Sequence, residues 1–461
     1  MVSISKCQKT KQKFSSNAHW QIQILLQNQD DILFFEVIIM KSTRLYLEIV
    51  SYIHYLISGE YFLRRSTERQ MDFSRKGKMS FTDYIYEIIH NTKSSLQVGL
   101  NSFFETYKKE NIEYTKQAFS KGRQRIKVKA FQELFYAVVE KFYEKADLTG
   151  WKGYQLFGID GTHLNLPCTD ELAELYGTQV TRGEPQVQAL VSCVYDLMNG
   201  IIVDTHFAPC NSSERIAAKD MITGFHVKNV TNPVFVMDRG YPSAELIDAI
   251  VNAGYKFIMR YPSEFLKTAK VQAEDTIIEH KFARLKHSLK LRVLKIQLPN
   301  GENEHLVTNI FDPDISSDDF KWVYRKRWDI ETKYDDVKNK LEIENFTGYS
   351  PKAILQDFYA TMFLANLAGV LEYDLHEEIE AAHNKPENRY AYKMNIAMTI
   401  SELKRTVVEM LATSSKLKRD SLYMDMTIRL AKAVVPERPN RSSKRAKKHK
   451  SMKYSNNSKR I

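Results

Sequence analysis

Three carboxylates stand where an enzyme that cleaves phosphodiesters needs metal ligands. Asp160 lies in the largely apolar stretch GYQLFGIDGTHLNLP, Asp238 follows the apolar stretch VFVM, and Glu331 lies in YRKRWDIETKYDDVK. An Asp on a strand, an Asp at a strand end and a Glu on a later helix can together hold two divalent ions. Mg²⁺ takes oxygen ligands, and two such ions activate the attacking oxygen and stabilise the leaving one. We therefore regard the three residues as candidate catalytic residues and metal ligands.

The segment from Tyr324 to Lys338 is predicted to be one helix with two faces. Tyr324, Arg327, Glu331, Asp335 and Lys338 recur at steps of 3, 4, 4 and 3, which places them on one face. A second stripe is apolar and is expected to dock on the core; it comprises Val323, Ile330, Tyr334, Val337 and Leu341. Arg327 and Lys338 suit phosphate oxygens, and Tyr324 can hydrogen-bond or stack on a base. These three are candidate DNA-binding residues.

Taken singly, such residues are weak signals. An Asp at a strand end is more often a turn or cap residue than a ligand, and a Glu on a helix is usually solvated. His163 is interpreted as a surface or packing residue, because imidazole suits zinc better than Mg²⁺. Trp322 and Trp328 are interpreted as core residues rather than as a platform for bases. The hypothesis rests on the joint occurrence of the carboxylates, in this order and on these elements.

The elements that would position the carboxylates follow an α/β pattern over residues 150–375. After the strand of Asp160, the pattern predicts two strands joined at Met198-Asn199-Gly200, a helix at 213–225, a strand at 234–237 and a helix opened by Ser243. This order indicates a mixed sheet with carboxylates on its first and fourth strands. A strand-rich insert is expected at about residues 262–318, with Asn300-Gly301 as its hairpin turn.

A small helical domain is predicted at residues 70–146, before the sheet. Ser80 and Thr115 are candidate N-caps of its first and third helices, and Ser94 or Ser95 begins the second. The third helix resembles a recognition helix of a helix-turn-helix domain. Its candidate DNA-binding residues are Lys116, Gln117, Lys121, Arg123, Gln124 and Arg125. The alternative interpretation of this segment is a solvated basic helix face.

The ends of the chain differ in composition from its centre. The net charge is +11, and residues 437–461 form a basic tail that we predict to be disordered. Residues 1–69 are a poorly defined extension, and 376–436 are expected to be helical. The cysteines have no metal-binding spacing, which favours a reducing compartment. The longest apolar run, at 32–40, is too short to span a bilayer, and we expect a cytoplasmic, nucleoid-associated prokaryotic protein without a membrane partner.

At the level of motifs the sequence resembles a known family. The pattern Tyr324-x2-Arg327-x3-Glu331-x6-Lys338 is similar to the Tyr-Arg-Glu-Lys signature of the DDE transposases of the insertion-sequence-four type. The stretches IDGTHLNLP and VMDRGYPS resemble that family's first two catalytic blocks. The resemblance covers about residues 70–375. One departure is that no Trp lies between residues 151 and 322, whereas some relatives use a Trp in the insert to hold a flipped base.

The resemblance implies both a fold and an activity. It implies a ribonuclease-H-like core, two Mg²⁺ or Mn²⁺ ions, and the triad of Asp160, Asp238 and Glu331. The expected activity is cut-and-paste transposition on DNA, at element ends and target DNA, by at least a homodimer because two ends must be brought together. Two alternatives remain open: a transposon-derived DNA-binding protein that has lost its chemistry, and a structure-selective nuclease with the same core.

Overall fold

The computed structural model describes residues 44–90, 95–108, 112–181, 184–262, 264–266, 274–297, 303–383, 385–386 and 388–438. The predicted turn at 300–301, residues 1–43 of the N-terminal extension and residues 439–461 of the basic tail lie outside this part of the chain.

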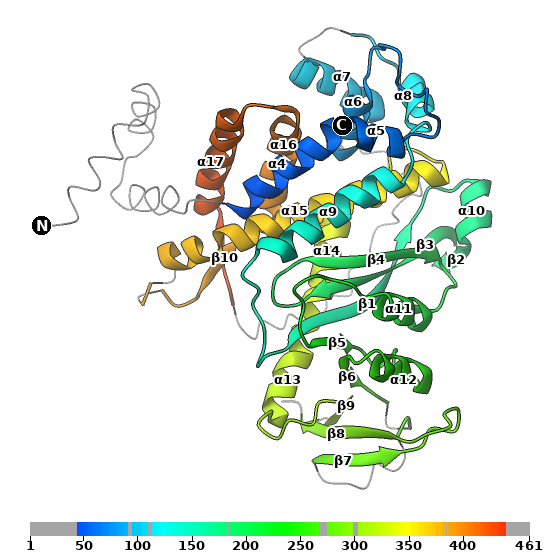
Figure 1. Cartoon of the computed structure of the whole chain (residues 1–461), viewed down its shortest axis with the longest axis vertical. Coiled ribbons are helices and arrows are strands. Elements are labelled where there is room, and N and C mark those ends of the chain that lie inside the picture. The colour runs from blue at the N-terminus through cyan, green and yellow to red at the C-terminus, as the bar shows by residue number, and fades with distance from the viewer. Residues whose placement is uncertain are drawn as a thin grey trace, which may run out of the picture.

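A single large sheet forms the centre of the molecule (Figure 1). In the described residues it has nine strands in the order β2-β3-β1-β5-β6-β9-β8-β7, with β4 also pairing with β3. Strands β1, β5 and β6 are parallel, whereas β3 is antiparallel to β1 and β4. The strands are β1 Gln155–Asn165, β2 Thr178–Thr181, β3 Glu184–Asp196, β4 Ile202–Pro209, β5 Pro233–Met237, β6 Lys256–Arg260, β7 Asp275–His280, β8 Leu289–Gln297 and β9 Asn303–Thr308. The prediction of a mixed α/β protein is confirmed.

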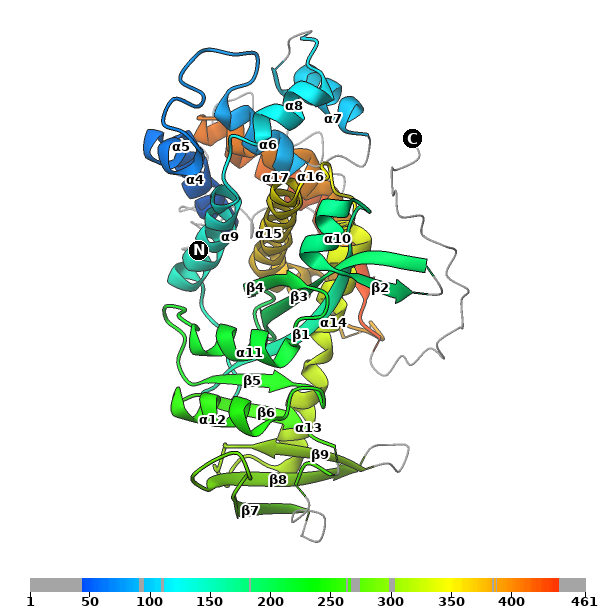
Figure 2. The same ribbon diagram turned by 90° about the vertical axis from the view of Figure 1, so that its right-hand side faces the viewer.

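Helices cover both faces of this sheet. Helices α11 (Glu214–Thr223) and α12 (Ala244–Asn252) lie on one face, and α13 (Ser317–Lys326) and α14 (Trp328–Asp335) lie on the other (Figures 1 and 2). Successive residues of a strand point to opposite faces of the sheet. Two glycines of β1 show this, because Gly158 faces Ile330 of α14 whereas Gly161 faces Glu214 of α11. Ser243 caps α12 by accepting a hydrogen bond from the backbone N–H of Leu246. The predicted helices after Ser213 and Ser243 are confirmed.

The segment predicted as a strand-rich insert extends the sheet. Strand β9 pairs antiparallel with β6, and β8 and β7 follow outward as antiparallel neighbours. Figure 2 shows these strands beyond α12, at the end of the molecule opposite the helical region. After β9 the chain enters α13 through a capping box of Ser316 and Asp319. The insert therefore separates the strand of Asp238 from the helix of Glu331 without interrupting the sheet.

The remaining helices form a layer beside β4. They are α4 Leu45–Ser58, α5 Glu60–Ser66, α6 Phe81–His90, α7 Leu96–Phe103, the π-helix η1 Phe104–Lys108, α8 Lys116–Arg123, α9 Lys129–Lys145, α15 Pro351–His383, α16 Ile396–Ala412 and α17 Lys416–Lys432. Thr115 caps α8 and Ser80 pairs with Asp83 at the start of α6, as predicted. A two-stranded sheet of β10 (Tyr392–Met394) and β11 (Val434–Pro436) was not expected. Helix α10 (Asp170–Tyr176) and strand β2 were also not expected.

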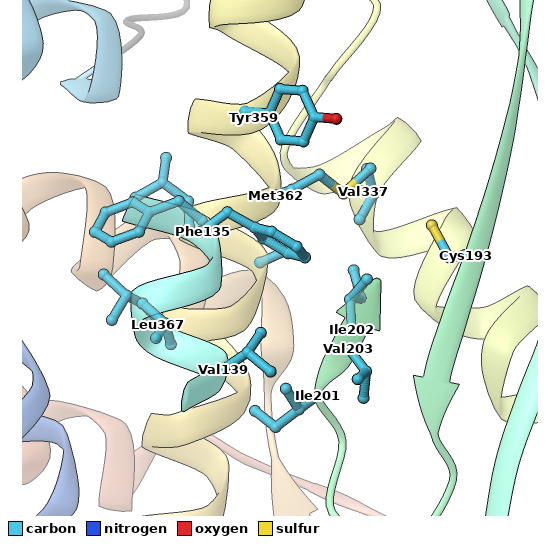
Figure 3. Close-up of a cluster of buried hydrophobic side chains, with 14 of the residues drawn as sticks. Phe135, Val139, Cys193, Ile201, Ile202, Val203, Val337, Tyr359, Met362 and Leu367 are labelled. Atoms are coloured by element: carbon cyan, nitrogen blue, oxygen red, sulfur yellow. The ribbon is translucent and has the colours of Figure 1, made fainter. Parts of the chain in front are cut away.

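The helical layer and the sheet share one apolar core. Phe135 and Val139 of α9 pack with Met362 and Leu367 of α15 and with Ile202 of β4 (Figure 3). The same cluster includes residues of α4 and of α14. Helix α15 is long and apolar enough to cross a membrane, but 94% of its apolar window is buried inside the protein. It is the central helix of this core; α6 and α9 of the segment predicted at 70–146 pack against it, as does α4 of the segment predicted as the extension 1–69.

Candidate active site

Strand pairing places Asp160 and Asp238 beside each other. Parallel strands β1 and β5 pair Gln155 with Pro233 and Gly158 with Val236, an offset of 78 residues. Asp160 and Asp238 have the same offset and lie two residues further along. Neighbouring strands are about 4.8 Å apart, so both carboxylates sit at the carboxyl end of β5, on the same side. The backbone N–H of Gly240 donates to Oδ1 of Asp238 at 2.7 Å.

The carboxyl group of Asp160 lies in a partly dry, acidic environment. Burial raises the pKa of Asp160 from 3.8 to about 7; the backbone N–H of Gly161 and the Arg327 guanidinium lower it, while Asp238 and Glu331 raise it further. Two other carboxylates therefore lie close enough to Asp160 to repel its charge. The structure thus brings together the three predicted carboxylates, which come from β1, the end of β5 and α14.

The helix predicted over 324–338 is broken, and this corrects the single-helix prediction. Helix α13 ends at Lys326, α14 begins at Trp328, and the π-helix η3 (Asp336–Lys340) follows. Arg327 lies at the joint with helical backbone angles. The apolar stripe is nevertheless buried as predicted, because its five members are all 8% exposed or less. Asp335 is exposed and accepts a hydrogen bond from Asn339, so it takes no part in the site.

Arg327 links helix α14 to strand β1. Its Nη2 donates to Oε1 of Glu331 at 2.8 Å, and its Nη1 lies 3.9 Å from Oδ2 of Asp160. The side chain is only 6% exposed, and its guanidinium lies over the rings of Tyr324 and Trp328. Arg327 therefore supplies the positive charge between two carboxylates that would otherwise repel each other.

Other residues of the signature hold α14 and η3 against β1. Lys338 donates through Nζ to Oγ1 of Thr162 at 2.6 Å and to the carbonyl of His163 at 2.7 Å. The hydroxyl of Tyr334 donates to the carbonyl oxygen of Asp160 at 2.7 Å. Tyr324 is buried, and burial raises its pKa. In this conformation Lys338 and Tyr324 act within the protein, at the edge of the carboxylate group.

The donor set fits a hard divalent cation, although the side chains are not in a ligating arrangement. In the described part of the chain, no three His, Cys, Asp or Glu side chains are placed as a ready metal site. The group offers only carboxylate oxygens, which Mg²⁺ and Mn²⁺ prefer. Burial, and to a smaller extent the charges of Asp238 and Glu331, raise the pKa of Asp160, and a bound cation would favour its ionised form. When a metal ion binds, Glu331 would leave its contact with Arg327 and bind the ion instead.

The candidate residues of the helical segment divide into two groups. Lys116, Gln117, Lys121 and Arg125 are exposed. Arg123 is 1% exposed and pairs with Asp357 of α15 at 2.6 Å. This corrects its prediction as a DNA-binding residue, because its guanidinium is already bonded inside the core. Gln124 is half-buried and donates to Oγ of Ser350 at 2.9 Å.

Two predictions about aromatic residues were wrong, and some site residues were missed. Trp322 and Trp328 are 42% and 53% exposed, so they are not core residues. His163 is half-buried and its ring nitrogen lies 3.1 Å from the carbonyl of Cys210, which suits the predicted packing role. Tyr241 lies close to the carboxylates and belongs to the stretch VMDRGYPS, whereas Glu214, which is also close to them, lies in no motif. The sequence signal for Glu214 was only its place after Ser213, at a helix start.

Comparison with known proteins finds similarity to transposases. Residues 151–367 match the family described as "Transposase DDE domain". The chain is 22% identical over 354 residues to "Transposase InsG for insertion sequence element IS4" of Escherichia coli (strain K12), which covers 73% of this chain and 77% of that protein. It is 29% identical over 139 residues to "Putative transposase InsZ" of the same organism, covering 29% of this chain and 44% of that protein.

A solved structure also resembles the chain over most of its length. It is described as "Cryo-EM structure of piggyBac transposase synaptic complex with hairpin DNA (SNHP)", with a TM-score of 0.44, 10% identity, and coverage of 86% of this chain and 87% of that one. The sequence matches define the class of the protein as a DNA-cleaving, strand-transferring enzyme. Residues 151–367 belong to the transposase DDE domain family, and the chain is similar to the transposase of the insertion-sequence-four element.

Proposed function

We propose that this transposase binds the ends of its own insertion sequence and cuts and joins DNA at Asp160, Asp238 and Glu331. Water attacks a phosphodiester at the element end, and the 3′-hydroxyl that is released attacks a phosphodiester of target DNA. The second step exchanges one phosphodiester for another and needs no external energy source. The observation that carries the proposal is the position of Arg327 between Asp160 and Glu331, together with the parallel register of β1 and β5 that brings Asp238 beside Asp160.

The three carboxylates would hold two divalent ions, Mg²⁺ or Mn²⁺. Bound there, the ions would activate the attacking oxygen and stabilise the leaving one. The parallel register of β1 and β5 supports Asp160 and Asp238 as neighbouring ligands. The contact of Arg327 with Glu331 supports Glu331 as the third ligand. The positively charged guanidinium lies beside this carboxylate, where a metal ion would lie.

Arg327, Lys338 and Tyr324 are proposed to position the DNA strand. Arg327 offers a planar fork for phosphate oxygens once Glu331 is released from it. Lys338 is fixed to β1 by Thr162 and His163, so it can orient a phosphate beside Asp160 as a point charge. The exposed Lys116, Gln117, Lys121 and Arg125, with Gln124, are proposed to contact the element end. Phosphate contacts of this kind dominate the affinity for DNA.

The core is proposed to be ribonuclease-H-like. The order β4-β3-β1-β5-β6, with three antiparallel strands followed by parallel ones, supports this assignment. The insert of β7 to β9 continues from β6 and leaves the carboxylate edge intact. We also propose that the enzyme acts as a homodimer in the complex that joins two ends, and that it works in the cytoplasm at the nucleoid.

The first prediction tests the triad by DNA cleavage. Asp160→Asn, Asp238→Asn and Glu331→Gln should each lower the rate of cleavage by at least about a thousandfold. Because such residues act as a unit, each single variant should lose nearly as much as the triple variant. The substrate is the gene with its flanking DNA, searched first for short inverted repeats bracketed by direct repeats.

Two controls give the cleavage test its meaning. Gel-shift binding to the same DNA should persist in all three variants, because phosphate contacts lie elsewhere. Glu279→Gln changes an exposed carboxylate of the insert and should cleave normally. If the wild-type protein binds element ends but never cuts them, the chain is an inactive DNA-binding protein instead. Appreciable nicking by Glu331→Gln in Mg²⁺ would remove Glu331 from the site.

A further inference from the structure

Glu214 lies against the catalytic strand beside Asp160. The residue after Asp160 is Gly161, and a Cβ atom placed there would lie 2.8 Å from both Cδ and Oε1 of Glu214. Any larger residue at this position would therefore push the Glu214 carboxylate away. Gly161 is a strand residue without positive φ, so its backbone does not require glycine. What glycine provides is room for a carboxylate from α11 at the edge of the candidate site.

A buried phenol faces the same acidic group. Tyr241 is 0% exposed, and its hydroxyl has no hydrogen bond of normal geometry among the described residues. Burial raises its pKa first, and the charges of Glu214, Asp160 and Asp238 raise it further, so all three carboxylates lie near this ring. Buried polar atoms in native proteins almost always have a partner. The hydroxyl faces the Glu214 carboxylate, whose hydrogen-bonding interaction with it is a further cause of the raised pKa.

The start of α11 is also tied to the loop of Asp238. Nε of Arg215 donates to the carbonyl of Gly240 at 2.7 Å, and the N–H of Gly240 donates to Oδ1 of Asp238 at 2.7 Å. This chain of hydrogen bonds fixes the first turn of α11 relative to Asp238. Glu214, the neighbour of Arg215 in that turn, is consequently held near the loop of Asp238.

We propose that Glu214 is a fourth carboxylate of the divalent-metal site and that Tyr241 is the residue that positions it. This inference rests on the proposed function, since it adds a ligand to the same site. The physical reason is charge: two divalent ions carry four positive charges, and Asp160, Asp238 and Glu331 supply only three negative ones. Glu214 completes the balance from the opposite face of β1, past Gly161.

The next helix of the fold provides a matched control. Glu245 occupies the first turn of α12 as Glu214 occupies that of α11, but it is directed to Arg284, whose Nη1 lies 3.0 Å from its Oε1. If an acid in the first turn served only to complement the helix dipole, substitution at the two positions would have the same effect. A role in metal binding separates them.

The experiment is calorimetric titration of Mn²⁺ into the metal-free full-length protein. Glu214→Gln should weaken Mn²⁺ affinity about tenfold, and Gly161→Ala should weaken it in the same direction because it displaces an intact Glu214. Tyr241→Phe should have a smaller effect, and Glu245→Gln none. The thermal unfolding temperature of each metal-free variant, measured in parallel, should stay within a few degrees of wild type.

The outcomes distinguish this inference from the proposed function. Asp160→Asn should abolish Mn²⁺ binding; if it does not, the site itself is wrongly assigned. If Asp160→Asn abolishes binding but Glu214→Gln and Gly161→Ala bind like Glu245→Gln, only the role of Glu214 is refuted. A fall in unfolding temperature for Glu214→Gln with unchanged Mn²⁺ affinity would mean that the residue merely supports α11. Should Glu214→Gln fail to fold, Gly161→Ala decides.

Discussion

At the scale of single residues, the raised pKa of Asp160 is the main electrostatic feature of the candidate site. Burial and the neighbouring carboxylates raise its pKa from 3.8 to about 7. Because the folded value lies above the unfolded one, ionising Asp160 opposes folding. The metal-free protein should therefore lose stability as pH rises from about 4 to about 7. A bound cation reverses this balance, because it favours the ionised carboxylate.

The second prediction follows from the proton that Asp160 holds below its raised pKa. Mn²⁺ must displace it, so the apparent affinity should be nearly constant above about pH 7 and fall by up to about tenfold per pH unit below it. Titrations in two buffers of different ionisation enthalpy should report close to one proton released at about pH 6 and almost none at about pH 8. Glu279→Gln serves as the control with an unchanged profile. A flat affinity across this range would show that Asp160 is not a ligand.

The candidate triad could be predicted from sequence because each member depends on local pattern. Asp160 and Asp238 follow apolar strand residues, and the equal offsets of the strands and of the two aspartates reflect their parallel pairing. Glu331 was placed by helical spacing alone. Glu214 could not be found in this way, because its position depends on the approach of α11 to Gly161 in three dimensions. No spacing between residues in the sequence predicts that contact.

At the scale of elements, the break at Arg327 divides the segment 324–338 into helices that pack against different strands. Helix α13 packs against β6 and β8 of the insert side, whereas α14 packs against β1. The π-turn of η3 then brings Lys338 over the end of β1, where it reaches Thr162. π-helical turns occur frequently at functional sites. The helix was predicted as continuous because hydrophobic periodicity does not reveal a one-residue interruption.

The third prediction separates Arg327 from Glu331. Arg327→Ala should lower cleavage and strand transfer by about a hundredfold, because small errors in positioning cost that much, while Mn²⁺ affinity should be unchanged or higher. Arg327→Lys should restore only part of the activity, since a single ammonium cannot span Asp160 and Glu331 as the fork does. Calorimetric Mn²⁺ titration beside a cleavage time course measures both effects. Equal loss of metal binding in the Arg327 and Glu331 variants would indicate a purely structural role for both.

At the scale of the whole molecule, the predicted helical domain and catalytic domain are joined through a buried contact. Arg123 of α8 pairs with Asp357 of α15 and also donates to Gln356 and Thr347. Helix α9 packs along α15 in the common core (Figures 1 and 3). If α8 recognises DNA, its contact with α15 would connect that recognition to a helix that packs against strand β4 of the sheet.

The fourth prediction tests this junction by stability. Arg123→Met should lower the free energy of unfolding by about 3–5 kcal/mol, because it leaves Asp357 as an uncompensated buried charge. The matched control is Arg125→Met, which removes an exposed cation stacked on Phe73 and should change stability by less than about 1 kcal/mol. Urea unfolding followed by circular dichroism gives both values. Loss of DNA affinity without loss of stability in Arg123→Met would restore Arg123 as a DNA contact.

The packing of the elements in three dimensions was harder to predict from the sequence than their order along the chain. The succession of strands and helices from β1 to β6 was readable from apolar runs and caps. The burial of Arg123 was not, because its partner lies 234 residues away, and a polar helix face looks alike whether it meets water or another helix. Residues 1–69 were predicted only as a poorly defined extension, whereas helix α4 of that segment packs against α9, α15 and α16.

The most direct test of the account asks whether three distant segments surround one metal site. Fe²⁺ can replace Mg²⁺ at oxygen-ligand sites, and with ascorbate and peroxide it generates radicals that cut the backbone next to the bound iron. Mass spectrometry of the products should show cuts close to Asp160, Asp238 and Glu331. Excess Mg²⁺ should suppress all of them, and Asp160→Asn should remove them together. Cuts at only one of these segments, or cuts that Mg²⁺ does not suppress, would contradict a shared site.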